Sequence, residues 1–248
     1  MKNTGILRIQ AFGARQSSPI EGVLVTVSGN GFTAQRITDE TGTAADLSIE
    51  APSCALSLQE DNTIRPYAVV DLTAAKAGFR TVRIQGVQIF SGQVTLAQPE
   101  MIPETEEDRD VVNPPIVIPE HSLFTGDGGS GPDPMENCMP RVLSRVIIPK
   151  NITVHLGKPA ASARNVTVSF RDYIANVASS EVYPTWPEQA LRANIHCQIS
   201  LALNRIYTEW YPSKGYTFNI TNSTSYDQYY VHGRTVFDVM VRITDDIF

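Results

Sequence analysis

A proline-rich, acidic segment in the middle of the 248-residue chain constrains the fold more than any other feature. Residues 99–140 contain eight of the sixteen prolines and ten acidic residues, against one basic residue, Arg109. A segment of this composition buries too little apolar surface to fold by itself and is typical of a linker. The chain is therefore predicted to form two domains, residues 1–98 and residues 141–248, joined by residues 99–140. The run PPIVIP within this linker is also suited to pair as a strand with a neighbour.

The charge of the chain is concentrated in the same segment. The formal net charge is −6, of which residues 99–140 contribute −9, residues 1–98 nothing and residues 141–248 +3. The acidic balance argues against a nucleic-acid binder, and three cysteines exclude a disulfide-stapled scaffold. The N-terminus, MKNTGILRIQAFGARQ, lacks the apolar stretch of a secretory signal, and no run of 18 apolar residues occurs. We expect a soluble protein that has no export signal and does not insert into a membrane.

Residues 5–98 alternate apolar and polar side chains, with turn residues between short runs. This pattern predicts an antiparallel β-sandwich, because side chains on successive residues of a strand point to opposite faces. The expected strands are Gly5–Phe12, Val23–Gly29, Ala34–Thr38, Ala44–Ile49, Tyr67–Ala74, Phe79–Val87 and Gln93–Ala97.

This first domain resembles the prealbumin-like, carboxypeptidase regulatory-like family. The residues that carry the resemblance are Pro19, Gly22, Val23, Val25, Val27, Thr38, Asp39, Gly42, Gly78 and Phe79. The resemblance implies a spacer or a docking module for a protein partner, and it says little about activity. Asp39 and Glu40 are candidates for binding Ca²⁺ in a turn, but acidic turns are more often simply solvated.

The second domain changes from strand to helix patterning. Strands are expected at residues 141–149, 151–157 and 165–170, then a helix at Asp172–Ser179 and a longer helix from Pro187 to Tyr207, with Thr185 as a candidate N-cap. The long helix is expected to pack through a face of mostly small residues: Ala190, Leu191, Ala193, Asn194, Cys197, Leu201 and Ile206. The domain is therefore predicted to be of the α+β class.

Two ordered blocks of this domain resemble the stage II sporulation protein D family, which includes the amidase enhancers. The first block has the family's Asp-Tyr pair at Asp172-Tyr173, its Glu-aliphatic-Pro element at Glu181, Val182 and Pro184, and its E-A-L-K-A-Q-A helix at Glu188–Asn194. The second block, residues 220–230, matches the family's S-T-x-Y-D-Q-x-Y. Two differences stand out: the family's usual Gly-Glu-Met-Pro is one residue longer here, and the chain ends before the family's last strands, so a C-terminally shortened domain is expected.

The resemblance implies cleavage of peptidoglycan glycan strands, by lytic transglycosylation in the best-known members, with Glu181 as the catalytic residue. In this reaction one group protonates the leaving oxygen and then accepts a proton from the attacking 6-hydroxyl of the sugar. Burial among apolar and aromatic neighbours such as Tyr183 and Trp186 is expected to raise the pKa of Glu181 and keep it protonated. A charge at a helix N-terminus, favoured by the helix dipole, is the other interpretation of Glu181.

The second block is expected to line the substrate groove. Its candidate sugar-binding residues are Ser223, Thr224, Tyr226, Asp227 and Gln228. Asp227 is also the best partner for Glu181 in a hydrolase, which needs a carboxylate pair. A strand-edge turn is the competing interpretation of Tyr226–Gln228. Trp210, Tyr211 and Tyr216 are candidates either for stacking on sugars or for the core.

Metal binding and cofactors are not expected. The candidate ligands Cys138, His155, His196, Cys197 and His232 do not have the spacing of a zinc site. Glu188 lies in the first turn of the long helix and is assigned to the helix dipole.

Two functions follow from these patterns. In the first, the protein cleaves peptidoglycan, and the context considered for it is the wall-cutting component of a phage-tail-like or contractile injection particle that meets the cell wall from outside. In the second, it is a structural or cell-wall-binding assembly protein whose glycan groove is vestigial or incomplete.

Overall fold

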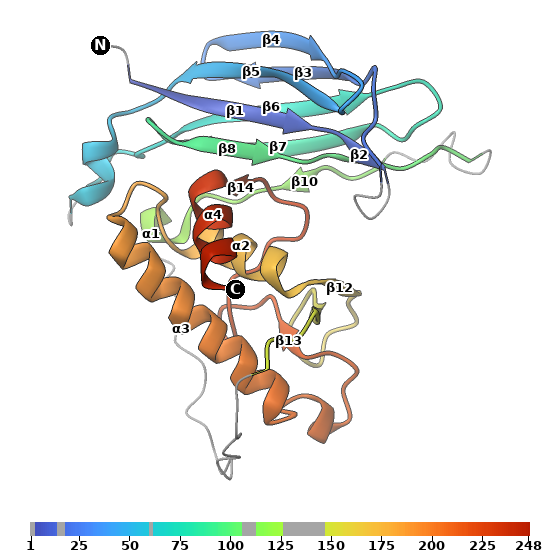
Figure 1. Ribbon diagram of the computed structural model, residues 1–248, viewed down its shortest axis with the longest axis vertical. Helices are drawn as coiled ribbons and strands as arrows, with labels where there is room; N and C mark the ends of the chain where they lie inside the picture. Colours follow the sequence, from blue (N-terminus) through green and yellow to red (C-terminus); the bar gives the residue numbers. More distant parts are fainter. Residues whose placement is uncertain (1–2, 14–17, 60–61, 106–112, 126–146) are drawn as a thin grey trace. The chain divides into compact units, whose positions relative to one another are not determined.

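The computed structural model describes residues 3–13, 18–59, 62–105, 113–125 and 147–248 (Figure 1). The chain is of mixed α and β structure, contains several β-sheets, and divides into two compact units. The first unit comprises Met1–Glu120 and Gly233–Val239, and the second comprises His121–His232 and Met240–Phe248.

Two sheets form the first unit. Their strands in chain order are β1 (Thr4–Gln10), β3 (Leu24–Gly29), β4 (Phe32–Ile37), β5 (Thr43–Glu50), β6 (Ala68–Ala75), β7 (Val82–Ile89), β8 (Val94–Ala97), β10 (Ile116–Val117) and β14 (Val236–Phe237). One sheet has the order β14-β8-β1-β5 and the other the order β10-β7-β6-β3-β4. A short parallel pair, β2 (Phe12–Gly13) with β9 (Glu100–Met101), and a 3₁₀ helix at Cys54–Leu58 complete the unit. All seven strands predicted from the alternating pattern are present, with ends shifted by a few residues.

One hydrophobic core lies between the faces of the two sheets. In β6 every second residue is buried, as expected for a strand with one face in the core. The core takes Leu7 and Ile9 from β1, and Leu72 from β6, all at most 1% exposed. The alternation of apolar and polar residues in the sequence corresponds to this alternation of buried and exposed side chains, because both follow from the local strand geometry.

The prediction of a purely antiparallel sandwich was wrong. Strand β1 pairs parallel with β8, and β10 pairs parallel with β7, so both sheets are mixed. Parallel pairing joins strands that are distant in sequence, and local alternation carries no information about it.

The segment predicted as a linker contributes strands to the first unit. Within residues 99–140, Glu100–Met101 forms β9 and Ile116–Val117 forms β10. The prediction that PPIVIP can lie as a strand is confirmed by the pairing of β10 with β7. The compact first unit extends to Glu120, beyond the expected boundary at residue 98. Residues 106–112 and 126–140 of the predicted linker lie outside the described residues.

A strand from the C-terminal part of the chain also belongs to the first unit. Strand β14 pairs antiparallel with β8, and the Phe237 ring meets the Phe90 ring edge-on, with centroids 5.3 Å apart. Two residues are too few for a recognisable alternation, so the sequence analysis did not predict this strand.

The turns of the first unit follow from their residues. Asn30 and Gly31 connect β3 to β4 with φ of 52° and 71°, the positive angles that a two-residue type I′ hairpin requires. In the turn before β5, Asp39 Oδ1 accepts hydrogen bonds from the backbone N–H groups of Thr41 and Thr43. The Thr41 hydroxyl bond, followed by the Thr43 backbone bond, lowers the pKa of Asp39. This carboxylate is therefore used to close the turn.

In its described residues, the second unit contains a three-stranded sheet and three helices of ten or more residues. The sheet has the order β12-β11-β13, and its strands are β11 (Asn151–His155), β12 (Asn165–Ser169) and β13 (Ile220–Thr221). The helices are α2 (Phe170–Glu181), α3 (Glu188–Tyr207) and α4 (Asp238–Ile247), with shorter turns at α1 (Ser122–Thr125) and a 3₁₀ helix at Pro212–Lys214. Of the predicted strand at 141–149, residues 147–149 are not in a strand and the rest lies outside the described residues.

Both predicted helices are present, but the packing face of α3 differs from the prediction. Ser169 caps α2 by accepting a hydrogen bond from the Asp172 backbone N–H at 3.1 Å. Pro187, and not Thr185, occupies the N-cap of α3. The buried face of α3 is Leu191, Ile195, Gln198, Ile199, Ala202 and Arg205, whereas the predicted Ala193 and Cys197 are exposed. The prediction failed because two polar residues, Gln198 and Arg205, occupy this face. In the described part of the chain, no helix has the length and apolar character needed to cross a membrane.

Candidate functional site

Polar side chains from α2 and α3 hold residues 222–231, an irregular stretch that follows β13. Asn176 on α2 makes paired bonds with the backbone of Val231: its Nδ2 donates to the Val231 carbonyl at 2.9 Å and its Oδ1 accepts from the Val231 N–H at 3.1 Å. The Tyr173 hydroxyl donates to Gln228 Oε1, and Gln228 Nε2 donates to the Gln198 carbonyl, both at 3.0 Å. The two sequence blocks that carry the resemblance therefore contact each other.

Glu181 lies at the last position of α2 and contacts both α3 and this stretch. Its Oε1 accepts a hydrogen bond from the Tyr229 backbone N–H at 2.9 Å, and its Oε2 accepts one from Gln198 Nε2 at 2.8 Å. The side chain is half-buried and has no cationic partner among the described residues. The alternative of an N-terminal helix charge was wrong, since Glu181 ends a helix instead of starting one.

Burial is the main influence on the acidity of Glu181. Loss of solvation raises the pKa of its carboxyl above the ordinary value of 4.5, while the Tyr229 and Gln198 hydrogen bonds act in the opposite direction. Burial, together with the charges of Asp227 and Glu181, also raises the pKa of Tyr173 well above its ordinary value. The pKa of Glu181 is therefore shifted in the direction that favours the protonated carboxyl.

Asp227 is part of a buried ion pair and is not free to act as a second carboxylate. Arg205 Nε donates to Asp227 Oδ1 at 2.7 Å, with the two side chains 3% and 0% exposed. Asp227 Oδ2 accepts three more bonds: from the Tyr211 hydroxyl at 2.5 Å, and from the N–H and hydroxyl of Thr221 at 3.0 and 2.7 Å. With both oxygens engaged, the arrangement does not provide the carboxylate pair of a hydrolase.

The other predicted sugar-binding residues differ in their exposure. Gln228 is buried in the hydrogen-bond network, and Tyr226 is 37% exposed. Ser223 and Thr224 are half-buried, and the Ser223 carbonyl accepts bonds from the backbone N–H groups of Tyr226 and Asp227. The backbone therefore turns at residues 223–227, which overlap the turn predicted for Tyr226–Gln228. Only part of this stretch is exposed to a ligand.

Tyr183 and Trp186 follow α2 in the connection to α3. Tyr183 is 6% exposed, and its ring lies 4.5 Å from that of His121 and 6.3 Å from that of Trp186, centroid to centroid. Trp186 is half-buried. These rings belong to the same connection between α2 and α3 that follows Glu181.

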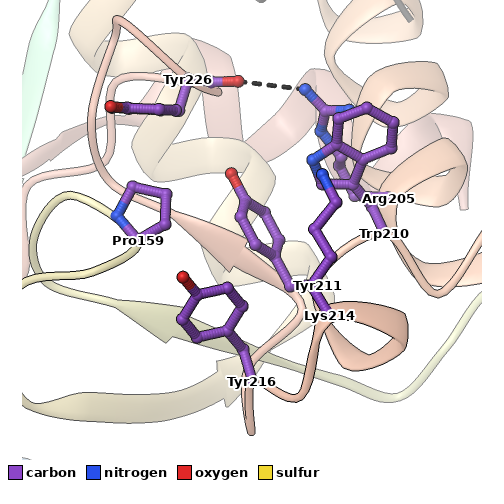
Figure 2. A pocket seen from close by; sticks show the side chains of 7 residues that line it. All are labelled: Pro159, Arg205, Trp210, Tyr211, Lys214, Tyr216 and Tyr226. Carbon is purple, nitrogen blue, oxygen red and sulfur yellow. Dashed lines mark hydrogen bonds between the residues drawn. The ribbon is translucent and has the colours of Figure 1, made fainter. Parts of the chain in front are cut away.

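An aromatic pocket of about 220 Å³ lies at the C-terminal end of α3 (Figure 2). Its lining residues are Pro159, Arg205, Trp210, Tyr211, Lys214, Tyr216 and Tyr226. A neighbouring hollow of about 340 Å³ shares Pro159 and Tyr216 with it and extends to His155. Glu181 lines neither of them. The aromatic residues of this pocket were predicted as candidates for sugar stacking or for the core. Its cations Arg205 and Lys214, and the Gln198 amide beside Glu181, were not predicted, because single cations and amides on a helix form no recognisable sequence pattern.

The histidines and cysteines proposed as weak metal candidates lie apart. His196 and Cys197 are exposed on α3, and the His155 ring stacks on Phe218 at 4.6 Å. Within the described ranges no three His, Cys, Asp or Glu residues form a cluster suited to a metal ion. Cys138 lies outside the described residues.

Comparison with known proteins shows no family. No protein-family model matches the chain, and no curated protein matches it. Solved structures that match include the Bacillus anthracis TIE protein, with 14% identity over 41% of this chain and 17% of that one and a TM-score of 0.30. Klebsiella pneumoniae 5-hydroxyisourate hydrolase matches with 21% identity over 40% of this chain and 92% of that one, with a TM-score of 0.27. Wild-type Acinetobacter radioresistens catechol 1,2-dioxygenase matches with 13% identity over 47% of this chain and 58% of that one, with a TM-score of 0.30. The chain spans less than two thirds of the first and the third. At these TM-scores the similarities carry no conclusion about this chain's function.

Proposed function

We propose that the second unit cleaves glycan strands of peptidoglycan as a lytic transglycosylase, with Glu181 as general acid and base. The observation that carries the proposal is the environment of Glu181: a half-buried carboxyl whose pKa is raised by burial and which has no cationic partner in the part of the chain that the structure describes. The resemblance of residues 171–206 and 220–230 to the stage II sporulation protein D family supports the same role. We also propose that the first unit is a spacer or docking module for a protein partner.

The reaction requires Glu181 to be protonated first and ionised afterwards. The protonated carboxyl donates its proton to the glycosidic oxygen as the bond from this oxygen to the anomeric carbon breaks. The 6-hydroxyl of the same sugar then forms a bond to the anomeric carbon, and its proton passes to the Glu181 carboxylate. The engagement of Asp227 with Arg205 favours this route, because it needs one carboxyl and not two.

Gln198 is suited to stabilise both protonation states of Glu181. When Glu181 is ionised, Gln198 Nε2 donates to its Oε2 at 2.8 Å. Gln198 Oε1 is buried without a hydrogen-bond partner. A half-turn of the amide would bring this oxygen to Glu181, where it can accept the proton of the neutral acid. The amide therefore complements the carboxyl before and after proton transfer.

A second candidate is a binding or assembly protein without catalysis. The observation that favours it is the internal use of residues predicted to bind sugar, since both Asp227 oxygens and the Gln228 amide are bonded within the unit. In this case Glu181 would act as a structural hydrogen-bond acceptor for α3 and Tyr229.

Digestion of purified peptidoglycan distinguishes the two candidates. The wild-type chain and Glu181→Gln are incubated with sacculi, and the soluble products are identified by mass spectrometry. Anhydro-muropeptides released by the wild type alone would support transglycosylation, and new reducing ends would indicate hydrolysis instead. Glu188→Gln is the matched control, because Glu188 is an exposed carboxylate paired with Arg192 at the start of α3. Sacculus binding without release would favour the binding protein.

A further inference from the structure

We propose that the aromatic pocket at the end of α3 binds an oligosaccharide that carries a carboxylate. The proposal concerns residues other than Glu181, and it does not rest on the proposed cleavage. It depends on how the end of α3 places Trp210, on the state of the two cations in the pocket, and on two tyrosine hydroxyls.

The end of α3 places Trp210 against Arg205. The backbone N–H of Glu209 donates to the Ile206 carbonyl and that of Trp210 to the Arg205 carbonyl, both at 3.2 Å, with Glu209 at φ 50°. This is the Schellman arrangement, which reverses the chain at a helix C-terminus. As a result the Arg205 guanidinium lies 4.4 Å from the centroid of the Trp210 ring.

The two cations of the pocket differ in whether an anionic partner already compensates their charge. Arg205 is buried, pairs with Asp227 and donates from Nη2 to the Tyr226 carbonyl at 3.0 Å, so its charge is compensated inside the protein (Figure 2). Lys214 is exposed, its ammonium lies 3.8 Å from the centroid of the Trp210 ring, and it makes no ion pair among the described residues. The pocket therefore offers one uncompensated positive charge, held in place by an aromatic face.

The remaining lining suits a pyranose ring. Figure 2 shows Tyr226, Tyr211, Tyr216 and Pro159 around an open space. The hydroxyls of Tyr216 and Tyr226 have no hydrogen-bond partner among the described residues, whereas the Tyr211 hydroxyl is held by Asp227. Phenol rings supply an apolar surface for the C–H face of a sugar, and their free hydroxyls can bond to sugar hydroxyls.

The backbone after α3 keeps these rings in position. Gly215 has φ 86°, a conformation that L side chains rarely adopt, and it ends the 3₁₀ helix Pro212–Lys214. The chain then returns so that the Tyr216 N–H donates to the Tyr211 carbonyl at 3.2 Å, and the two rings meet edge-on at 6.1 Å. Tyr216 also packs on Phe218, with ring centroids 5.1 Å apart.

The size and charge of the site select among ligands. Its volume of about 220 Å³ is below the roughly 300–1,000 Å³ of pockets for drug-sized molecules, which suits a single ring. The neighbouring hollow across Pro159 and Tyr216 provides room for a second ring. One free ammonium matches one carboxylate, whereas a nucleic acid would require several cations along its phosphates.

The test compares disaccharides that differ in charge. The probes are glucuronic acid joined to N-acetylglucosamine, N-acetylglucosamine joined to N-acetylmuramic acid, and neutral chitobiose. Affinities for the full chain are measured by NMR chemical-shift titration in low salt. We expect both acidic disaccharides to bind about fivefold more tightly than chitobiose, the ratio expected for one partly solvated charge pair. The relative affinities of the two acidic probes distinguish a uronic acid from a lactyl group as the source of the carboxylate.

Variants assign the binding to the pocket. Lys214→Met should remove the preference for acidic sugars without changing the affinity for chitobiose, and Tyr226→Ala should weaken the binding of all three. Lys150→Met is the matched control, because Lys150 is another exposed lysine of the second unit. Cleavage is scored separately by the sacculus digestion with Glu181→Gln, so that failure of cleavage and failure of binding in the pocket are separable. Equal affinity for acidic and neutral sugars, an unchanged preference in Lys214→Met, or no binding at millimolar concentrations would each overturn the proposal.

Discussion

The side-chain amide of Gln198 and the carboxylate of Glu181 are joined by a 2.8 Å hydrogen bond that links the middle of α3 to the end of α2. The bond favours the ionised form of Glu181, while burial favours the neutral form. The acidity of this residue is therefore set by two opposing effects, and each can be changed by substitution.

Gln198→Leu should raise the pKa of Glu181 further, because it removes a donor that stabilises the carboxylate. The free energy of unfolding should fall by about 1–3 kcal/mol, as a partly buried acceptor loses its partner. The pKa is measured by NMR titration of the Glu side-chain carbons, and the stability by urea unfolding. Gln189→Leu, at an exposed position of the same helix, is the control. An unchanged Glu181 pKa would contradict the expected role of the amide.

The stability of the protein should depend on pH through Glu181. The pKa of its carboxyl is raised in the folded state, so folding favours the protonated form. This contribution is complete below pH 4.5, the ordinary value, and is lost as the pH rises through the raised pKa of the folded state. Relative to Glu181→Gln, the wild type should therefore become less stable as the pH increases above 4.5. Urea unfolding of both proteins across this range measures the difference, and a difference independent of pH would refute the assignment.

Asp227→Asn should destabilise the second unit strongly. The substitution leaves the Arg205 guanidinium buried without a counter-charge, and breaking one side of a buried ion pair costs about 3–5 kcal/mol. Asp245→Asn provides the matched control, since Asp245 pairs with Arg171 at the surface and both side chains are about half exposed. That change should cost less than about 1 kcal/mol. Equal losses in the two variants would show that the Asp227 pair contributes no more than a surface pair.

Glu209→Gly should stabilise the protein slightly. Glu209 has φ 50°, in the left-handed region that glycine adopts without steric cost. The gain should be about 0.5–1 kcal/mol, after allowing for the greater freedom of glycine in the unfolded chain. Thermal unfolding measures it. Glu209→Ala removes the same carboxylate but keeps the Cβ atom, so it should bring no such gain; a similar gain in both would point to the charge and not to the backbone.

Local pattern was sufficient to locate most elements of the fold. The seven strands between Thr4 and Ala97 and the two helices after Ser169 were predicted close to their observed ends. The pairing of the strands was not predicted from this pattern. Strands β1 and β8 and strands β10 and β7 pair in parallel, and β14, which pairs with β8, comes from the far end of the chain. The packing face of α3 was also mispredicted, because its buried Gln198 and Arg205 look like surface residues in the sequence.

The sequence by itself determined where the chain forms strands and helices, and it singled out Glu181 and residues 220–230 through a resemblance. Only the tertiary structure decided how these residues are used: Asp227 pairs with Arg205 inside the unit, and Glu181 has no cationic partner among the described residues. The tertiary structure also placed Lys214 against the Trp210 ring. The physical reason is that secondary structure follows from the order of neighbouring side chains. Burial and hydrogen-bond partners, which set the charge state and availability of a group, come from residues that are distant in sequence.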